Sequence, residues 1–173
     1  MRRLRNMMTS LGLLAMSLLL SAASAQAQST WTGTNHMNAA RSGQTATVLR
    51  SGQVLVAGGE NSIGNVQTTE LYNPSTGSWT LTGNSVVARA TAAAALLSNG
   101  NVLVAGGCNT DCIGALSSSE IYNPITRRWT LIARMATPRF SFTATVLISG
   151  KVLVAGGCTA TNLHERHEQG RAV

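Results

Sequence analysis

The chain has 173 residues, which predicts one ordinary domain rather than a multidomain enzyme. Hydrophobic residues make up 44% of it and charged residues only 11%, which excludes a disordered tail, because such tails combine low hydrophobicity with high charge density. The net charge is +7, but three of the 13 Lys and Arg residues lie within residues 1–25. The other basic residues are scattered and almost all Arg, with no basic stripe and no interleaved aromatic residues. We therefore expect no nucleic-acid partner.

Residues 1–25 predict a secretory signal peptide. A basic start is followed by an uncharged run rich in Leu and Ala from Leu11 to Ala23, and the small residues Ala23-Ser24-Ala25 close it. The alternative, a membrane anchor, is disfavoured because this run is too short to span a hydrocarbon core of about 30 Å at about 1.5 Å per residue. We expect cleavage after Ala25, contact with a membrane only during export, and a secreted or periplasmic protein.

A repeat of about 50 residues organises the rest of the chain. The run Val-Leu-Val-Ala-Gly-Gly occurs three times, with spacings of 48 and 50 residues. The first Gly of each doublet follows an Arg by 17 residues and a Trp by 27 residues, and a Glu-x-Tyr-Asn-Pro block follows the first two doublets. The repeated positions are Trp31, Trp79, Trp129, Arg41, Arg89, Arg139, Gly58, Gly59, Gly106, Gly107, Gly156, Gly157, Glu70, Glu120, Tyr72 and Tyr122.

Each period predicts four antiparallel strands. The first strands are residues 45–49, 92–97 and 143–148, and the second are the Val-Leu-Val-Ala runs; both are nearly continuous apolar runs, which favours burial on both faces. The third strand is the Glu-x-Tyr block, which ends at Asn-Pro because Pro cannot donate to a strand ladder. The fourth is Trp-Thr-Leu, and we expect Trp31 to belong to the fourth strand of a preceding unit.

A hydrophobic strand ending in Gly-Gly, followed by a spaced Tyr and Trp, resembles the kelch repeat of β-propellers. The units are also similar to those of secreted bacterial kelch proteins related to the propeller of galactose oxidase. The resemblance covers residues 31–158 and implies an all-β fold of four-stranded antiparallel blades. Within a propeller segment of residues 26–158, the expected units are 41–82, 89–132 and a partial 139–158, followed by a polar irregular tail at 159–173.

About two complete blades do not form a closed propeller alone, because propellers close with about four to eight blades. Stacked repeats need neighbours to bury both faces of each sheet. We therefore expect open apolar blade faces at each end of the segment, available for self-association. The Gly-Gly doublets are expected to turn the backbone, and the Tyr and Trp residues to supply the surfaces on which sheets stack.

The charged residues that recur in register predict buried ion pairs. Arg41, Arg89 and Arg139 repeat together with Glu70 and Glu120, so we expect Arg-Glu pairs that tie strands or blades together. A catalytic carboxylate at these positions is disfavoured, because an active site occurs once and these residues occur in successive units.

Export would place the three cysteines in an oxidising compartment. Cys108 and Cys112 are close enough in sequence to form a local disulfide, which leaves Cys158 without a partner. Free thiols are the alternative. A metal site is disfavoured, because two thiols with no nearby His or third Cys fall short of the four ligands of structural zinc.

The sequence predicts a non-catalytic binding module that recognises a protein or glycan, with no cofactor. The loops after the second and fourth strands are long and share one rim, where recognition usually occurs. These loops are residues 60–67, 81–88, 108–116 and 132–138. The alternatives are a truncated or frameshifted propeller remnant without independent activity, and a fragment of a secreted enzyme similar to galactose oxidase.

The enzyme alternative would need the Tyr and His copper ligands and the Tyr-Cys crosslink that the resemblance to galactose oxidase implies. Tyr72 and Tyr122 occupy a repeated structural position instead, and His36 is a lone loop residue. In the tail, His164 and His167 lie three residues apart, whereas the zinc-protease helix motif needs four. We expect no metal site and no catalysis.

Overall fold

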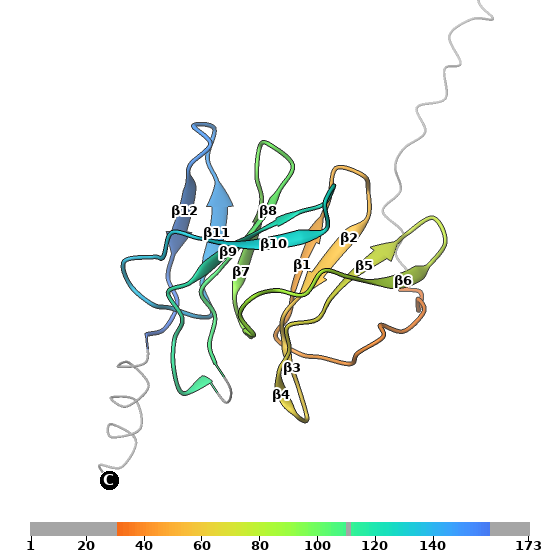
Figure 1. Ribbon diagram of the computed structural model, residues 1–173, viewed down its shortest axis with the longest axis horizontal. Coiled ribbons are helices and arrows are strands. Elements are labelled where there is room, and N and C mark those ends of the chain that lie inside the picture. The colour runs from red at the N-terminus through yellow and green to blue at the C-terminus, as the bar shows by residue number, and fades with distance from the viewer. Residues whose placement is uncertain (1–30, 110–111, 160–173) are drawn as a thin grey trace, which may run out of the picture. The chain divides into compact units, whose positions relative to one another are not determined.

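A computed structural model describes residues 31–109 and 112–159 (Figure 1). The predicted signal peptide and residues 160–173 of the predicted tail lie outside this part of the chain. The chain divides into two units, residues 1–33 and 34–173. Of the first unit only residues 31–33 are described; they form no strand, and Trp31 is fully exposed. The strand predicted at Trp31 is therefore wrong, because the described residues offer it no partner strand.

The described residues of the second unit form two four-stranded antiparallel sheets, one two-stranded antiparallel sheet and a small hairpin. The first sheet has the order β1-β2-β5-β6, the second β7-β8-β9-β10, and the third β11-β12. The strands are β1 (Thr45–Val48), β2 (Val54–Ala57), β5 (Thr69–Asn73), β6 (Ser78–Thr82), β7 (Ala93–Leu96), β8 (Val102–Ala105), β9 (Ser119–Asn123), β10 (Arg128–Ile132), β11 (Thr143–Val146) and β12 (Val152–Ala155). The hairpin is β3 (Glu60–Asn61) and β4 (Gly64–Asn65). The predicted all-β class and antiparallel four-stranded blades are confirmed, and no sheet is closed.

The tight turns repeat because the same residues recur at their corners. Gly52, Gly100 and Gly150 lie between the first and second strands of each sheet with φ of 82°, 87° and 80°, a region that favours Gly. After the third strands, the Asn73 Oδ1 accepts a hydrogen bond from the N–H of Ser75, and the Asn123 Oδ1 accepts one from Ile125. This Asn turn, with Pro in its second position, ends the third strand and begins the fourth.

The sheets pack on one another through their apolar faces. Strand β7 lies beside both β1 and β11 (Figure 1). Leu55 and Leu71 of the first sheet form a buried cluster with Val102, Val104 and Tyr122 of the second. A second cluster joins the second sheet to the third through residues that include Leu103, Ala105 and Phe142. The second sheet is thus covered on both faces.

Burial on both faces was predicted for all three Val-Leu-Val-Ala strands; it holds for β8 and for three of the four residues of β2, but not for β12. All four residues of β8 are buried. In β12 the prediction is wrong: Leu153 is 53% exposed and Ala155 is also exposed. The sequences are the same, so the difference comes from the neighbours, since no described residue covers the outer face of β12.

No helix among residues 31–109 and 112–159 has the length and apolar character needed to cross a membrane.

Candidate functional site

The structure brings Arg41 together with Glu70, and Arg89 together with Glu120. The Arg41 Nη2 lies 2.8 Å from the Glu70 Oε1, and the Arg89 Nη2 lies 2.7 Å from the Glu120 Oε1. All four side chains are essentially excluded from solvent. Pairs buried this completely need further hydrogen bonds to offset the loss of hydration of their charges.

Each Arg also joins the second strand of its sheet to the third. The Arg89 Nη1 donates to the carbonyl oxygens of Gly106 and Ser118, at 2.6 and 2.9 Å, and the Nη2 donates to the Ser118 hydroxyl. Arg41 makes the same set of bonds to Gly58 and Thr68. Because the two sets match in kind and position, these Arg residues hold the architecture together.

Each Glu in turn holds the segment that leads into its own sheet. The two Glu120 carboxylate oxygens accept the backbone N–H groups of Val86 and Val87, at 2.6 and 3.0 Å. The Glu70 carboxylate accepts the N–H groups of Asn38 and Ala39, at 2.8 and 3.1 Å. Strand and connecting segment are therefore tied through one carboxylate. Both oxygens of each carboxylate accept hydrogen bonds within this arrangement.

Arg139 is the third Arg of the repeat, and it has no acidic partner among the described residues. Its side chain makes one hydrogen bond, from Nη1 to the Gly156 carbonyl oxygen at 2.8 Å. The third pair therefore lacks the carboxylate that completes the other two.

Glu70 has a perturbed acidity. Burial raises its pKa, whereas hydrogen bonds from the Asn38 backbone and side chain and the Ala39 N–H, together with the positive charge of Arg41, lower it. The net effect is a pKa below the usual value of 4.5. Hydrogen bonding to the charged form therefore outweighs desolvation.

The lowered pKa predicts acid sensitivity. Below about pH 4.5 the unfolded chain binds more protons than the folded chain, so the Glu70 contribution to stability is complete above that pH and is lost as the pH falls through the folded-state pKa. We expect the urea midpoint of the wild-type chain to fall more steeply below about pH 4.5 than that of Glu70→Gln. Equal slopes in the two proteins would contradict this assignment.

The aromatic and glycine positions of the repeat have structural contacts. Tyr72 packs on Trp79 with ring centroids 4.9 Å apart, and Tyr122 packs on Trp129 at 5.1 Å. The Trp129 Nε1 donates to the Gly83 carbonyl oxygen at 2.8 Å, which fastens the segment between the first two sheets. The six doublet glycines all have positive φ: Gly58, Gly59, Gly106, Gly107, Gly156 and Gly157.

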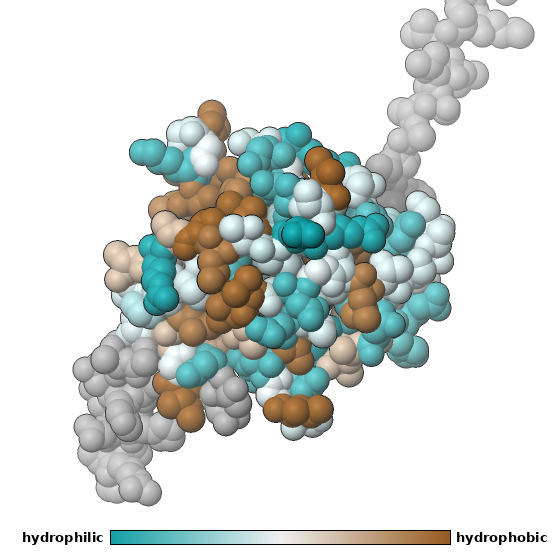
Figure 2. Space-filling model, in the orientation of Figure 1, coloured by the Kyte–Doolittle hydropathy of each residue, from teal (hydrophilic) through white to brown (hydrophobic). Residues whose placement is uncertain are grey.

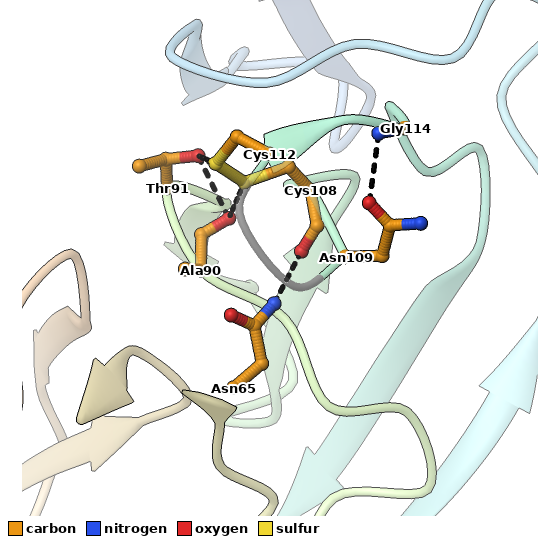
Figure 3. Close-up of a disulfide and its surroundings, with 7 residues drawn as sticks. All are labelled: Asn65, Ala90, Thr91, Cys108, Asn109, Cys112 and Gly114. Carbon is orange, nitrogen blue, oxygen red and sulfur yellow. Dashed lines mark hydrogen bonds between the residues drawn. A yellow bond between two sulfur atoms is a disulfide. The ribbon is translucent and has the colours of Figure 1, made fainter. Parts of the chain in front are cut away.

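Cys108 and Cys112 form a disulfide within the loop that follows β8 (Figure 3). Cys108 is fully buried, and the hydroxyl of Thr91 lies 3.3 Å from its sulfur. Cys158 is a free thiol. The disulfide closes one of the four loops that were predicted to share a rim. From here on, the long-loop rim means a narrower set than that prediction: residues 39–42, the β3-β4 hairpin and the described residues 108–109 and 112–116.

Thiol alkylation should report this pairing. We expect one alkylated cysteine, Cys158, in the denatured but unreduced chain, and three after reduction. Intact-mass spectrometry before and after reduction measures both numbers. Three alkylated cysteines without reduction would contradict the disulfide, and Cys158→Ser should leave none before reduction.

Two segments of the long-loop rim are linked directly. The Asn65 Nδ2 at the end of β4 donates to the Cys108 carbonyl oxygen at 2.7 Å, as Figure 3 shows. The Asn65 Oδ1 is buried and has no hydrogen-bond partner among the residues that the structure describes. An open hollow of about 800 Å³ lies beside the hairpin, lined by Ala39, Ala40, Arg41, Ser42, Glu60, Asn61 and Ser62.

A second cavity lies at the opposite rim, where the short turns are. It has a volume of about 370 Å³ and is mainly apolar, with two Arg residues in its wall. Its lining includes Leu49, Arg50, Leu71, Pro124, Ile125 and Arg127. The sequence did not predict this cavity, because it forms between the turns of two sheets. The available sequence signal was the hydrophobic Ile125 directly after Asn-Pro, and the structure shows that this residue is exposed.

No group of three or more His, Cys, Asp or Glu residues that could hold a metal ion occurs within the described ranges. His36 is exposed. Tyr72 and Tyr122 lie against their Trp partners in two different sheets, so the structure does not bring them together with His36 as a ligand set. His164 and His167 lie outside the described residues.

Residues 89–136 match the family model of the Kelch motif. The match begins at Arg89 and contains all four strands of the second sheet. No curated protein matches the chain. The Kelch motif and the four-stranded antiparallel sheets together fit a part of a kelch-repeat propeller. Kelch-repeat domains are generally non-catalytic binding modules, and the motif indicates a module for protein interaction.

Proposed function

We propose that the chain is an exported, non-catalytic binding module that recognises a protein or glycan through its long-loop rim. The observation that carries this proposal is the hydrogen bond to Cys108 from Asn65, the β4 residue that pairs with Glu60 of the open hollow. It fastens the β3-β4 hairpin to a loop that is itself closed by a disulfide. A rim held in one conformation loses less conformational entropy on binding than free loops would.

The chemistry of the hollow supports recognition of polar groups. Glu60, Asn61 and Ser62 are only partly buried or exposed, and they offer a carboxylate, an amide and a hydroxyl to a ligand. Such groups bind the hydroxyls of a glycan or the backbone of a protein loop. The recurring charged residues are already engaged in the architecture, which supports binding rather than catalysis.

A binding screen with two sets of variants tests this proposal. The purified chain is applied to an oligosaccharide array and to a phage library of displayed peptides, and the selected ligands are titrated by calorimetry. We expect Glu60→Ala with Ser62→Ala to weaken binding at least tenfold, and Arg127→Gln in the opposite cavity to leave it unchanged. Loss of binding in Arg127→Gln alone, or no ligand of either class, would contradict the proposal.

Export is tested independently of the ligand. N-terminal sequencing of the protein recovered from the periplasm or medium of a bacterial host should begin at Gln26. Protein retained in the cytoplasm with residues 1–25 attached would contradict export without bearing on what the rim binds.

A further inference from the structure

One edge of strand β12 is unpaired within the described residues, and the kind of strand that would pair with it occurs twice elsewhere in the chain. In the first two sheets, β2 and β8 carry the same Val-Leu-Val-Ala sequence, and each pairs antiparallel with a Glu-x-Tyr strand, β5 or β9. The registers agree: Val56 faces Glu70, and Val104 faces Glu120. Within the described residues β12 pairs only with β11, so its other edge presents backbone groups suited to the same kind of strand.

The guanidinium of Arg139 lacks the contacts that such a strand would supply. Arg41 and Arg89 each bind one carbonyl of the Gly doublet, and Arg139 binds the corresponding carbonyl of Gly156. The other hydrogen bonds that the Nη atoms of Arg41 and Arg89 donate all go to residues of the third strand or to the residue before that strand. For Arg89 the acceptors are the Ser118 carbonyl, the Ser118 hydroxyl and the Glu120 carboxylate. Arg139 is therefore already positioned by Gly156 and has unused donors on the side where β12 is unpaired.

Two backbone N–H groups complete a carboxylate-binding site beside Arg139. Glu120 binds the N–H groups three and two residues before Arg89. The corresponding residues before Arg139 are Ala136 and Thr137, which are exposed and whose N–H groups donate to no acceptor within the described ranges. Their segment has the same local structure, because the Met135 N–H donates to the Ser117 carbonyl just as the Ser85 N–H donates to that of Gln67.

The surface next to this site is apolar. Ile121 is only partly buried and Ile132 is 39% exposed, both on the face of the second sheet that turns toward β11 and β12. The corresponding Leu71 of the first sheet is buried in the cluster that contains Tyr122. Figure 2 shows hydrophobic side chains gathered over β9, β10 and β11. An aromatic residue two positions after an incoming Glu would cover Ile121 and Ile132 as Tyr122 covers Leu71.

We propose that β12, Arg139 and the N–H groups of Ala136 and Thr137 form an acceptor site for one extended strand of a partner polypeptide. The strand binds antiparallel to β12 with its Glu on Arg139, a Ser or Thr two residues before that Glu, and an aromatic residue two residues after it. Strands β5 and β9, which carry this pattern, are already paired within their own sheets, so a folded second copy does not supply them. Main-chain pairing supplies affinity, and the buried carboxylate supplies specificity.

A peptide with the sequence of residues 117–124, Ser-Ser-Ser-Glu-Ile-Tyr-Asn-Pro, tests the site. It is labelled with a fluorophore and titrated with the purified full chain, and binding is followed by fluorescence anisotropy. We expect saturable binding that weakens at least tenfold when the peptide Glu is replaced by Gln. This comparison leaves the protein unchanged, so it does not depend on the folding of a variant.

Protein variants assign the binding to Arg139. Arg139→Gln should weaken binding at least tenfold, whereas Arg134→Gln, an exposed Arg in the same connecting segment, should leave it unchanged. Glu60→Ala with Ser62→Ala should also leave it unchanged, which separates this site from the long-loop rim. Three outcomes would overturn the proposal: no saturable binding, equal binding of the Glu and Gln peptides, or a dimer in light scattering that the peptide does not dissociate.

Discussion

Arg89→Met should destabilise the chain by about 3–5 kcal/mol, which approaches the whole stability of many domains. The substitution keeps the length of the apolar stem but leaves the Glu120 carboxylate fully buried without its cation. It also removes the bonds from Arg89 to Gly106 and Ser118 that join the second and third strands. Urea unfolding followed by Trp fluorescence measures the loss, because Trp129 lies in the same sheet.

The repeat itself supplies the control for this substitution. Arg139→Met removes the same side chain at a position where no described carboxylate is present, and the one described bond that it removes is the bond to Gly156. We expect a cost of about 1 kcal/mol, typical of one hydrogen bond. The double variant Arg89→Met with Glu120→Leu should recover much of the loss, because no buried charge remains. Equal destabilisation by Arg89→Met and Arg139→Met would contradict the argument.

Most of the strand positions could be predicted because each of them occurs more than once. The predicted first strand at 92–97 is observed at Ala93–Leu96, although a run of four Ala favours helix; its register with two β-branched counterparts identified it as a strand. Trp31 shows the limit of this reasoning. Its sequence matches the other two Trp positions, but a strand also needs a neighbour to pair with.

The side chains of the candidate site could be predicted from the sequence, but the backbone groups that bind them could not. Arg89 and Glu120 could be selected from the sequence because charged residues are rare in this chain and these recur in register. The N–H groups of Val86 and Val87 bind the Glu120 carboxylate. The sequence could not predict this, because every residue except Pro has the same backbone donor.

The β3-β4 hairpin was missed for a different reason. Residues 60–67 were predicted as a long loop, and part of this loop forms two strands of two residues each. Strands this short have no detectable periodicity. The Asn61 Oδ1 accepts a hydrogen bond from the Ile63 N–H at 2.9 Å, and this bond stabilises the turn of the hairpin.

A comparison of Gly106→Ala with Gly156→Ala tests how closely the third sheet packs on the second. Both residues have positive φ, 60° and 74°, so each substitution carries a backbone cost of about 1–2 kcal/mol. At Gly106 the added Cβ would also lie 2.5 Å from the Arg139 carbonyl oxygen and 2.7 Å from the Phe142 ring. At Gly156 it would meet no atom of the described residues within 4 Å.

We therefore expect Gly106→Ala to destabilise the chain by about 1–3 kcal/mol more than Gly156→Ala, because a carbonyl oxygen in the backbone can move aside only if the third sheet moves with it. Urea unfolding of both variants gives the difference, and the shared backbone cost cancels in it. Gly58→Ala should behave like Gly106→Ala, since its Cβ would lie 2.5 Å from the Arg89 carbonyl oxygen. Equal losses at Gly106 and Gly156 would mean that the Gly doublets serve only to turn the chain, and that the third sheet does not pack closely on the second.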